Sequence, residues 1–544
     1  MSRVLVIGID GGTFDLLRPW AEQGYLPTLR RLMAEGATGL LESTLPPVTS
    51  PAWPTFSTGK NPGKHGVFDF IRPTGGEFEL VNSTSIKAPT LWRILSEAGR
   101  RVGVINVPIT YPPAPVNGFL IGGMLSPKGS HHTYPDDLLA AYEPELGPYR
   151  ISPAVQYKRG NEEAFIDDLI DLVEQRGKYG LRLMQAHTPD FMMLHFQASD
   201  VLQHALWKFV DPAHPLHDPQ QAAHIVPRMR QVFEHIDHYV GRMTELAGDD
   251  ATVIIMSDHG FGSLHWVVNL NLLFLDAGLL HLKKNAFTRV RAGLFRAGLT
   301  PASVWHLIER VGLQNYVWLV SKSTRNKVVS KFLSFDDVDW SRTQAYSMGH
   351  VGQVYINLKG REPHGVVERG AEYEAVRQRV IEVLQTLRHP QTGAPLLERV
   401  ILGEAAAHGP YAGSAPDLHI IMDGYRAIVF PLFAADGRLV TRQIRGDSGC
   451  HRAHGILVAH GPAVKPGYTI EGAHILDLAP TILHVMGLPV PEDMDGRALT
   501  AMLTSDRAVA YESTERAQTG AETGLSAVES AEVEDRLRSL GYLG

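Results

Sequence analysis

The sequence is poor in cysteine, because only Cys450 among its 544 residues carries a thiol. One cysteine excludes an intramolecular disulfide and any cysteine-based zinc finger, and it fits a reducing compartment. We therefore predict a cytoplasmic protein in which Cys450 is a small bystander rather than a nucleophile. Any metal ion must be bound by histidines and carboxylates.

Long apolar runs are also lacking. No stretch approaches the roughly 20 apolar residues that span a membrane, and the N-terminal run 4–9 ends on Asp10 without a signal-peptide cleavage site. A composition of 44% hydrophobic and 20% charged residues excludes a mostly disordered or collagen-like chain. Because membrane-spanning apolar runs are lacking, we expect a soluble or at most peripheral protein. We also find no nucleic-acid-binding module in the sequence.

Short apolar runs alternate with helical patterns along the chain, which predicts an α/β protein. Runs so short and so continuously apolar are typical of strands buried on both faces, and hence of a mostly parallel central sheet flanked by helices. The predicted strands are residues 4–9, 102–107, 191–196, 251–256, 417–422 and 455–459.

The strand rhythm breaks between residues 267 and 360, where we predict an inserted basic helical cap. The cap divides the α/β core into residues 1–266 and 361–504, and residues 505–544 are predicted to form an acidic linker and a C-terminal tail. Residues 281–331 hold ten Lys and Arg residues against the single acid Glu309, a local charge of +9 in a chain of net charge −7.

One helical stretch of the cap has an apolar face with Arg289 and Arg296 on the opposite side. Two interpretations stay open: peripheral contact with an anionic membrane, or packing on the core with the arginines facing solvent or an anionic substrate. The residues of the apolar face are Phe287, Val290, Leu294 and Ala297.

Acidic and imidazole side chains follow three of the predicted strands, where ligands of open α/β sheets bind. Asp10 follows the first strand, and Asp258 with His259 follows the strand 251–256. Asp200 and His204 lie four residues apart on a predicted helix, so they share one face. Each taken alone has a plainer interpretation: a helix cap for Asp10, a capping Asp and a satisfied His for Asp258 and His259, and an ordinary hydrogen bond between Asp200 and His204.

Two further segments extend this set. Thr49 and Ser50 lie between prolines at a predicted helix start, where they are either a nucleophilic hydroxyl pair or caps of a rigid loop. His451 and His454 precede the strand 455–459, where either one is a further nitrogen ligand or a solvated loop histidine. Together these residue types suffice for two neighbouring divalent ions, the arrangement that clamps the attacking and leaving oxygens in phosphoryl transfer.

These residues, in this order, resemble the alkaline phosphatase superfamily and, within it, the type I phosphodiesterase/nucleotide pyrophosphatase family. The most specific segments are Thr49-Ser50-Pro51 through Thr58-Gly59, His65-Gly66 and Ser257-Asp258-His259-Gly260. The resemblance implies an alkaline phosphatase-like fold in which Thr49 takes the phosphoryl group. It implies two divalent ions, Zn²⁺ or alternatively Mn²⁺, with the ligand sets Asp10, Thr49, Asp258 and His259 for one and Asp200, His204 and His451 for the other.

The resemblance also exposes two departures. Where the family has an asparagine that binds a phosphoryl oxygen, this chain has Phe70, so we expect Lys60, Lys64 or Arg452 to bind the substrate instead. The (C/S)-x-P-x-R pattern of sulfatases is missing at Thr49, which argues against sulfatase activity.

We therefore expect a two-metal hydrolase of phosphodiester or pyrophosphate bonds that acts through a phosphothreonine intermediate. Its substrate would be a phosphate-ester small molecule or a lipid head group. The alternatives are a phosphomonoesterase or phosphomutase of the same superfamily, and a non-catalytic protein that binds metal and phosphate esters.

Overall fold

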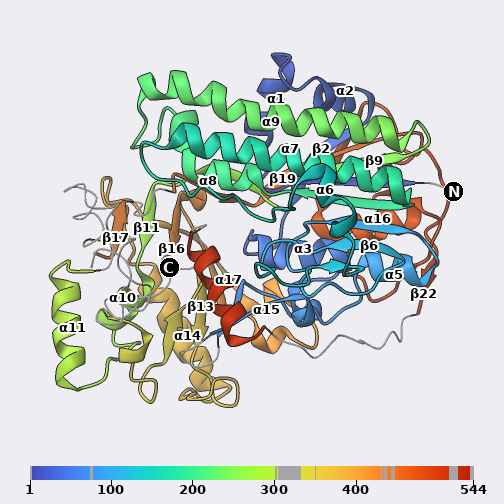
Figure 1. Ribbon diagram of the computed structural model, residues 1–544. Coiled ribbons are helices and arrows are strands. Elements are labelled where there is room, and N and C mark those ends of the chain that lie inside the picture. The colour runs from blue at the N-terminus through green and yellow to red at the C-terminus, as the bar shows by residue number, and fades with distance from the viewer. Residues whose placement is uncertain are drawn as a thin grey trace.

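Nine strands form the central sheet of the computed structural model, in the order β20-β2-β19-β9-β1-β8-β5-β6-β7 (Figure 1). The structure describes residues 3–73, 78–300, 303, 333–349, 351–429, 433, 438–442, 447–513 and 525–539. The strands of this sheet are β1 (Val4–Ile9), β2 (Ala37–Glu42), β5 (Val102–Ile105), β6 (Gly118–Ile121), β7 (Thr133–Tyr134), β8 (Phe191–Phe196), β9 (Thr252–Met256), β19 (His454–His460) and β20 (Tyr468–His474).

The sheet is mixed but mostly parallel, as the sequence predicts. β1 pairs in parallel with β8 and β9, and β5 pairs in parallel with β6 and β8. β19 is antiparallel to both β2 and β9, and β7 is antiparallel to β6. The fold class is therefore confirmed, whereas the predicted strand 417–422 does not belong to this sheet.

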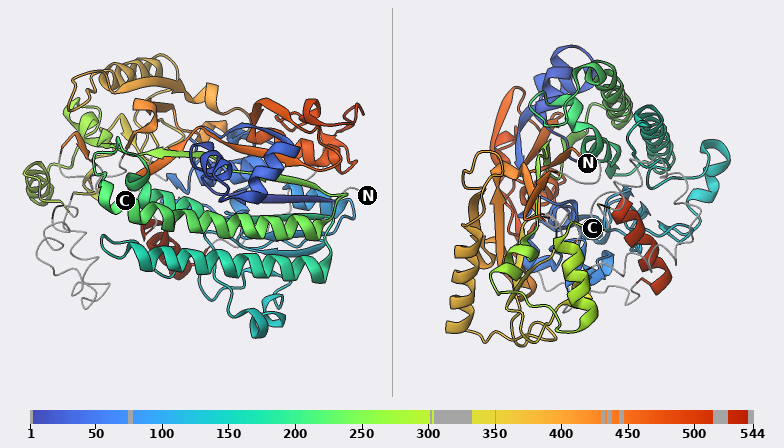
Figure 2. Two further views of the ribbon diagram at one scale, coloured as in Figure 1. Left: turned by 90° about the horizontal axis from the view of Figure 1, so that it is seen from above. Right: turned by 90° about the vertical axis from the view of Figure 1, so that its left-hand side faces the viewer.

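Side chains of β1 alternate between the two faces of the sheet, as strand geometry requires. Leu5, Ile7 and Ile9 enter one hydrophobic cluster, and Val4 and Val6 enter another. The first face is covered by α1 (Phe14–Glu22), α2 (Pro27–Glu35), α7 (Glu162–His187), α8 (Ala198–Val210) and α9 (Pro219–Ala247). The second is covered by α3 (Thr49–Thr58), α5 (Leu91–Glu97) and α16 (Leu478–Val485). Figure 2 shows α7 and α9 side by side.

A second unit lies beyond one end of the sheet and has its own hydrophobic cluster (Figure 1). It contains a four-stranded and a three-stranded sheet. The strands are β12 (Ala345–Ser347), β13 (Gln353–Ile356), β15 (Leu418–Met422) and β14 (Leu397–Leu402), and then β16 (Ala427–Val429), β11 (Trp266–Val268) and β17 (Val440–Arg442). Its longer helices are α10 (Leu270–Asp276), α11 (Ala286–Arg296) and α14 (Ala371–Leu384).

The second unit differs from the predicted helical cap in two respects. Residues 267–360 include β12 and β13 as well as helices, because the apolar residues around Tyr346 and Val354 form a buried hairpin. The four-stranded sheet joins β13 to β15, so it crosses the boundary predicted at residue 360. Five of the ten predicted cap cations, Arg310, Lys322, Arg325, Lys327 and Lys331, lie outside the described residues.

The C-terminal part ends on helix α17 (Ala527–Ser539), whose Val533 and Leu537 are fully buried. Residues 514–524 of the predicted linker lie outside the described part. The remaining elements are α4 (Pro62–His65), α6 (Glu143–Leu146), α15 (Gly403–Ala406), β3 (Ile71–Pro73), β4 (Phe78–Leu80), β10 (Gly260–Ser263), β18 (Gly449–Arg452), β21 (Val490–Pro491) and β22 (Tyr511–Glu512). Across the described ranges, none of the helices combines the length and apolarity of a membrane span.

Asp237 connects two helices that cover the sheet. Its carboxylate, on α9, accepts hydrogen bonds from the backbone N–H groups of Thr28 and Leu29 at 3.0 and 2.7 Å. These donors belong to the first turn of α2, whose own N-cap residue provides no side-chain acceptor. Asp237 thus supplies the cap from outside the helix.

We expect Asp237→Ala to lower the free energy of unfolding by about 1–3 kcal/mol, because two buried N–H groups lose their acceptor. Chemical denaturation measures this change. Asp250→Ala is the control, since that carboxylate only forms an exposed ion pair with Arg3; an equal loss of stability in both variants would contradict the capping role.

Candidate metal centre

The first cluster of ligand-type side chains brings together Asp10, Asp258 and His259 at the carboxyl edge of the central sheet. Asp10 directly follows β1, and the other two residues follow β9. His259 Nε2 lies 3.6 Å from Asp10 Oδ1 and 3.3 Å from Asp258 Oδ2, and all three side chains are buried. Thr13, not Asp10, caps helix α1, so the interpretation of Asp10 as a helix cap is wrong.

The second cluster brings together Asp200, His204 and His451. Helix α8 holds the first two residues one turn apart, as their spacing predicts. The Nε2 atoms of the two histidines lie 3.0 Å from each other and 3.5 and 3.4 Å from Asp200 Oδ1. His454 is exposed at the start of β19, so His451 is the histidine that reaches this cluster.

The two clusters are in direct contact. The imidazole rings of His259 and His451 stack with centroids 3.6 Å apart. The antiparallel pairing of β10 with β18 sets this contact, since Phe261 lies opposite His451. Gly11 allows the close approach on the other side: its φ is +63°, a Cβ there would lie 2.8 Å from the Phe261 ring, and its N–H donates to Asp258 at 3.3 Å.

Thr49 is the first residue of α3 and is completely buried. Its Oγ1 lies 3.2 Å from Nε2 of His259, so the hydroxyl adjoins the first cluster. The N–H groups of a first helical turn have no partner within the helix and favour an anion. The Thr49 hydroxyl therefore lies next to the first cluster and at a helix N-terminus, which favours anions.

Three carboxylates are buried close together in this site, and their pKa values diverge. Burial, followed by the nearby Asp258 and Asp200, raises the pKa of Asp10 well above its usual range. Burial and then Asp200 raise the pKa of Asp258 to about 7. Burial also opposes the ionisation of Asp200, but the neighbouring His204 and His451 outweigh it and lower its pKa. Positive charge is therefore needed to keep all three ionised.

The donor atoms fit divalent cations. Among the described residues, Oδ1 of Asp10 and Oδ2 of Asp258 are buried without a hydrogen-bond partner, which is costly unless a cation binds there. His259 Nδ1 lies 3.1 Å from the Gly260 carbonyl oxygen, which leaves Nε2 directed at the carboxylates. Two groups of His and Asp ligands side by side are consistent with a binuclear metal site.

Lys60 and Lys64 do not lie at this site. Helix α3 carries the chain about 15 Å away from Thr49 before Lys60 is reached. There the Lys60 ammonium pairs with Asp493, and Lys64 donates to Asp495 at 2.5 Å. These contacts give no support to their predicted role in binding the substrate, because both charges serve to hold the 493–496 loop against α4.

Arg452 also departs from its predicted role. Neighbouring residues of a strand point to opposite sides, so Arg452 points away from His451. Its guanidinium donates to backbone carbonyl oxygens of Tyr425 and Ser263, at 3.0 and 2.6 Å. The adjacent Cys450 is buried, and burial raises the pKa of its thiol to about 11, in keeping with a bystander.

Sequence reasoning missed His195, which supports Asp10 from near the carboxyl end of β8. Its Nε2 lies 2.8 Å from Asp10 Oδ2, and its Nδ1 lies 2.9 Å from the Asn106 carbonyl oxygen. A histidine inside an otherwise apolar, buried strand was the available signal, because such a group requires a polar partner.

Phe70 does reach the site, where it lines the same small cavity as His204 and His451.

The chain matches the family model for type I phosphodiesterase/nucleotide pyrophosphatase over residues 4–455. It therefore belongs to this family of hydrolases, within the alkaline phosphatase superfamily. A search of curated proteins finds no match in sequence.

Solved structures share the fold at low sequence identity. Human ectonucleotide pyrophosphatase/phosphodiesterase 5 is 14% identical with a TM-score of 0.49, over 93% of this chain and 100% of that one. An inactive variant of the murine protein in complex with AMP has the same identity and coverage and a TM-score of 0.50. Phosphonoacetate hydrolase from Sinorhizobium meliloti 1021 is 14% identical with a TM-score of 0.47, over 88% and 94% of the chains.

We expect the chelator-treated protein to take up two divalent ions per chain and His204→Ala to take up one, because the second cluster loses a ligand. Elemental analysis after gel filtration counts the ions. Binding should also stabilise the protein, by about 2.7 kcal/mol at a free metal concentration 100 times Kd. The control is the exposed His454, whose alanine variant should keep both ions; equal losses in the two variants would contradict the assignment.

Proposed function

We propose that this protein is a two-metal hydrolase that cleaves phosphodiester or pyrophosphate bonds through a phosphothreonine intermediate. The observation that carries the proposal is the position of the Thr49 hydroxyl, 3.2 Å from His259 Nε2 at the first turn of α3. Family membership supports a phosphate ester as the substrate. The buried, unpartnered carboxylate oxygens of Asp10 and Asp258 support divalent cations as cofactors.

Each residue of the site has a role in this proposal. Thr49 Oγ1 forms a bond to phosphorus while the bond from phosphorus to the leaving oxygen breaks, and water then hydrolyses the phosphothreonine. N–H groups of the first turn of α3 bind a non-bridging oxygen. His195 holds Asp10 in place, and Asp10, Asp258 and His259 orient the threonine hydroxyl.

The two clusters would hold one divalent ion each, and bound ions would supply Lewis-acid stabilisation of the attacking and leaving oxygens. We propose zinc first, because imidazole and carboxylate donors without thiolates suit it, although manganese accepts the same donors.

The decisive test is Thr49→Ala, assayed with bis(p-nitrophenyl) phosphate. We expect turnover to fall about a thousandfold or more while metal content is retained, because the covalent route is lost. Ser57→Ala is the matched control on the same helix, since that hydroxyl donates to the Pro54 carbonyl oxygen and has no part in the reaction. Wild-type turnover by Thr49→Ala would refute the proposed nucleophile.

The same assay separates the alternative functions. A phosphomonoesterase or phosphomutase needs additional positive charge for a dianionic substrate, but Lys60 and Lys64 lie away from the site and pair with Asp493 and Asp495. The proposal therefore favours the diester over p-nitrophenyl phosphate, which has the same leaving group. Preference for the monoester would favour the first alternative, and hydrolysis of neither ester would favour a binding protein.

A further inference from the structure

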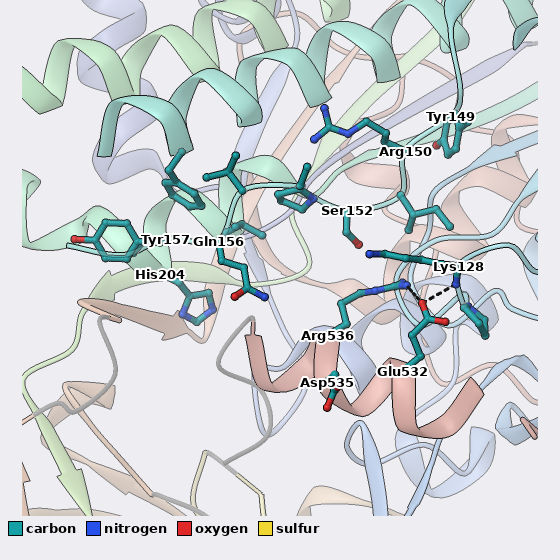
Figure 3. A pocket seen from close by; sticks show the side chains of 18 of the residues that line it. Lys128, Tyr149, Arg150, Ser152, Gln156, Tyr157, His204, Glu532, Asp535 and Arg536 are labelled. Carbon is teal, nitrogen blue, oxygen red and sulfur yellow. Dashed lines mark hydrogen bonds and ion pairs between the residues drawn. The ribbon is translucent and has the colours of Figure 1, made fainter. Parts of the chain in front are cut away.

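A cavity of about 720 Å³ opens beside His204 of the second metal cluster (Figure 3). Figure 3 shows Tyr157, Gln156 and His204 on one side, and Glu532 and Arg536 of helix α17 on the other. Residues 149–157 form much of the remaining wall. The cavity thus extends from the metal centre to the C-terminal helix.

Helix α17 is firmly attached to this wall. Glu532 accepts a hydrogen bond from the backbone N–H of Lys128 at 2.8 Å, and the Arg536 guanidinium donates to the Ser126 carbonyl oxygen at 2.6 Å. Val533 and Leu537, both fully buried, face the hydrophobic cluster of the second unit. A segment remote in sequence from every metal ligand therefore closes the cavity.

Three polar groups in the cavity wall lack partners. The hydroxyls of Tyr149 and Ser152 and the Nε2 atom of His132 are buried and, within the described chain, have no hydrogen-bond partner. His132 Nδ1 lies 2.9 Å from the Ser130 carbonyl oxygen, so Nε2 is left as an acceptor. Burial raises the pKa of Tyr149 to about 12, which keeps its hydroxyl protonated. Buried groups of this kind are satisfied in native proteins by an ordered water or by a polar ligand.

The charges of the wall favour a neutral ligand. Its cations and its carboxylates are equal in number, and Arg150 and Arg536 already pair with Asp168 and Glu532. Aromatic rings of Tyr149, Tyr157 and Phe165 add flat apolar surface. The charged residues of the wall are Lys128, Arg150, Arg536, Asp447, Glu532 and Asp535.

We propose that this cavity binds a neutral polyol ring, such as a sugar or a cyclitol, as the leaving group of the substrate. The inference rests on the proposed phosphodiester hydrolysis. His204 belongs to the cluster that would hold the ion at the leaving oxygen, and it also lines the cavity, so the cavity adjoins the position of the leaving group. The bond from phosphorus to the polyol oxygen breaks, and that oxygen keeps the electron pair and takes a proton from solvent.

Two diesters with one shared arm test the cavity: methyl p-nitrophenyl phosphate and the methyl phosphodiester of myo-inositol. We expect Tyr149→Phe and Ser152→Ala each to lower kcat/KM for the inositol ester about tenfold relative to the nitrophenyl ester, because only the polyol uses these hydroxyls. Tyr25→Phe, on an exposed tyrosine, should leave the ratio unchanged. An unchanged ratio in the two cavity variants would overturn the inference.

Failure of the proposed function gives a different result, in which the wild-type protein cleaves neither ester. Saturation-transfer NMR with free myo-inositol then examines the cavity without turnover. A signal that disappears in Tyr149→Phe but not in Tyr25→Phe supports polyol binding, and the lack of any signal overturns it. The thermal unfolding midpoint of each variant shows whether it is folded. If Tyr149→Phe does not fold, the comparison is made with Ser152→Ala, which is the smaller change.

An independent observation concerns helix α11, whose apolar face points to solvent. Phe287 and Val290 are 80% and 62% exposed, and Leu294 is 39% exposed. The helix packs through Thr288 and Phe295 instead. The interpretation in which the apolar face of α11 packs on the core is therefore wrong.

The segment that carries this face contributes charge of one sign, whereas the acidic residues beside it, Asp276, Asp336 and Asp337, come from neighbouring elements. Residues 281–300 contain five cations and no acidic residue, and Lys283, Lys284 and Arg289 are exposed beside the apolar side chains. Arg291 and Arg296 pair with Asp337 and Asp276, which fixes the helix on the second unit. We infer that α11 contacts an anionic lipid surface with its apolar face inserted between head groups.

Co-sedimentation with vesicles tests this contact. We expect binding to phosphatidylcholine vesicles that contain phosphatidylserine, and at least a tenfold loss of binding in Phe287→Asp/Val290→Asp. Val528→Asp is the matched control, because that valine is 81% exposed on α17. Binding that is independent of the two α11 residues overturns the inference, as does a concentration-dependent dimer that the double variant abolishes.

Discussion

Burial of three carboxylates within one small site is the constraint on which the rest of the structure depends. Asp10, Asp200 and Asp258 are nearly inaccessible to water, and burial, followed by their mutual repulsion, raises the pKa of Asp10 and Asp258. Such an arrangement is unfavourable for folding unless compensating charge or hydrogen bonds are built in. The fold provides the hydrogen bonds, since His195 and the backbone N–H of Gly11 hold Asp10 and Asp258 in position. Burial lowers the pKa of His204 and of His259, so these imidazoles are neutral donors and the compensating charge has to come from cations.

The central sheet makes this concentration of charge attainable. β1, β8 and β9 are neighbouring parallel strands, so the residues that follow them emerge at one edge although they are far apart in the chain. Continuous apolar burial on both faces then holds these strands in place. Helix α3 enters from the opposite layer and directs Thr49 at the same edge.

The parts of this design that follow from local patterns were predictable from the sequence. Short apolar runs indicate the central strands, and the spacing of Asp200 and His204 indicates their shared helix face. Long-range partners were not predictable in the same way: the lysines Lys60 and Lys64 look suited to phosphate until Asp493 and Asp495, more than 400 residues later, occupy them. Strand β15 likewise has the apolar signature of the central sheet, and only its pairing with β13 and β14 assigns it elsewhere.

The second unit is inserted between Asp258-His259 and His451, yet these residues meet. The chain enters the insertion through β10 and returns through β18, and the two strands pair directly, with Gly260 opposite Arg452 and Ser263 opposite Gly449. This short antiparallel ladder fixes the register of His451 whatever lies in the roughly 185 residues between the strands. The inserted unit can therefore vary its surface, including α11, without displacing His451 from the candidate metal centre.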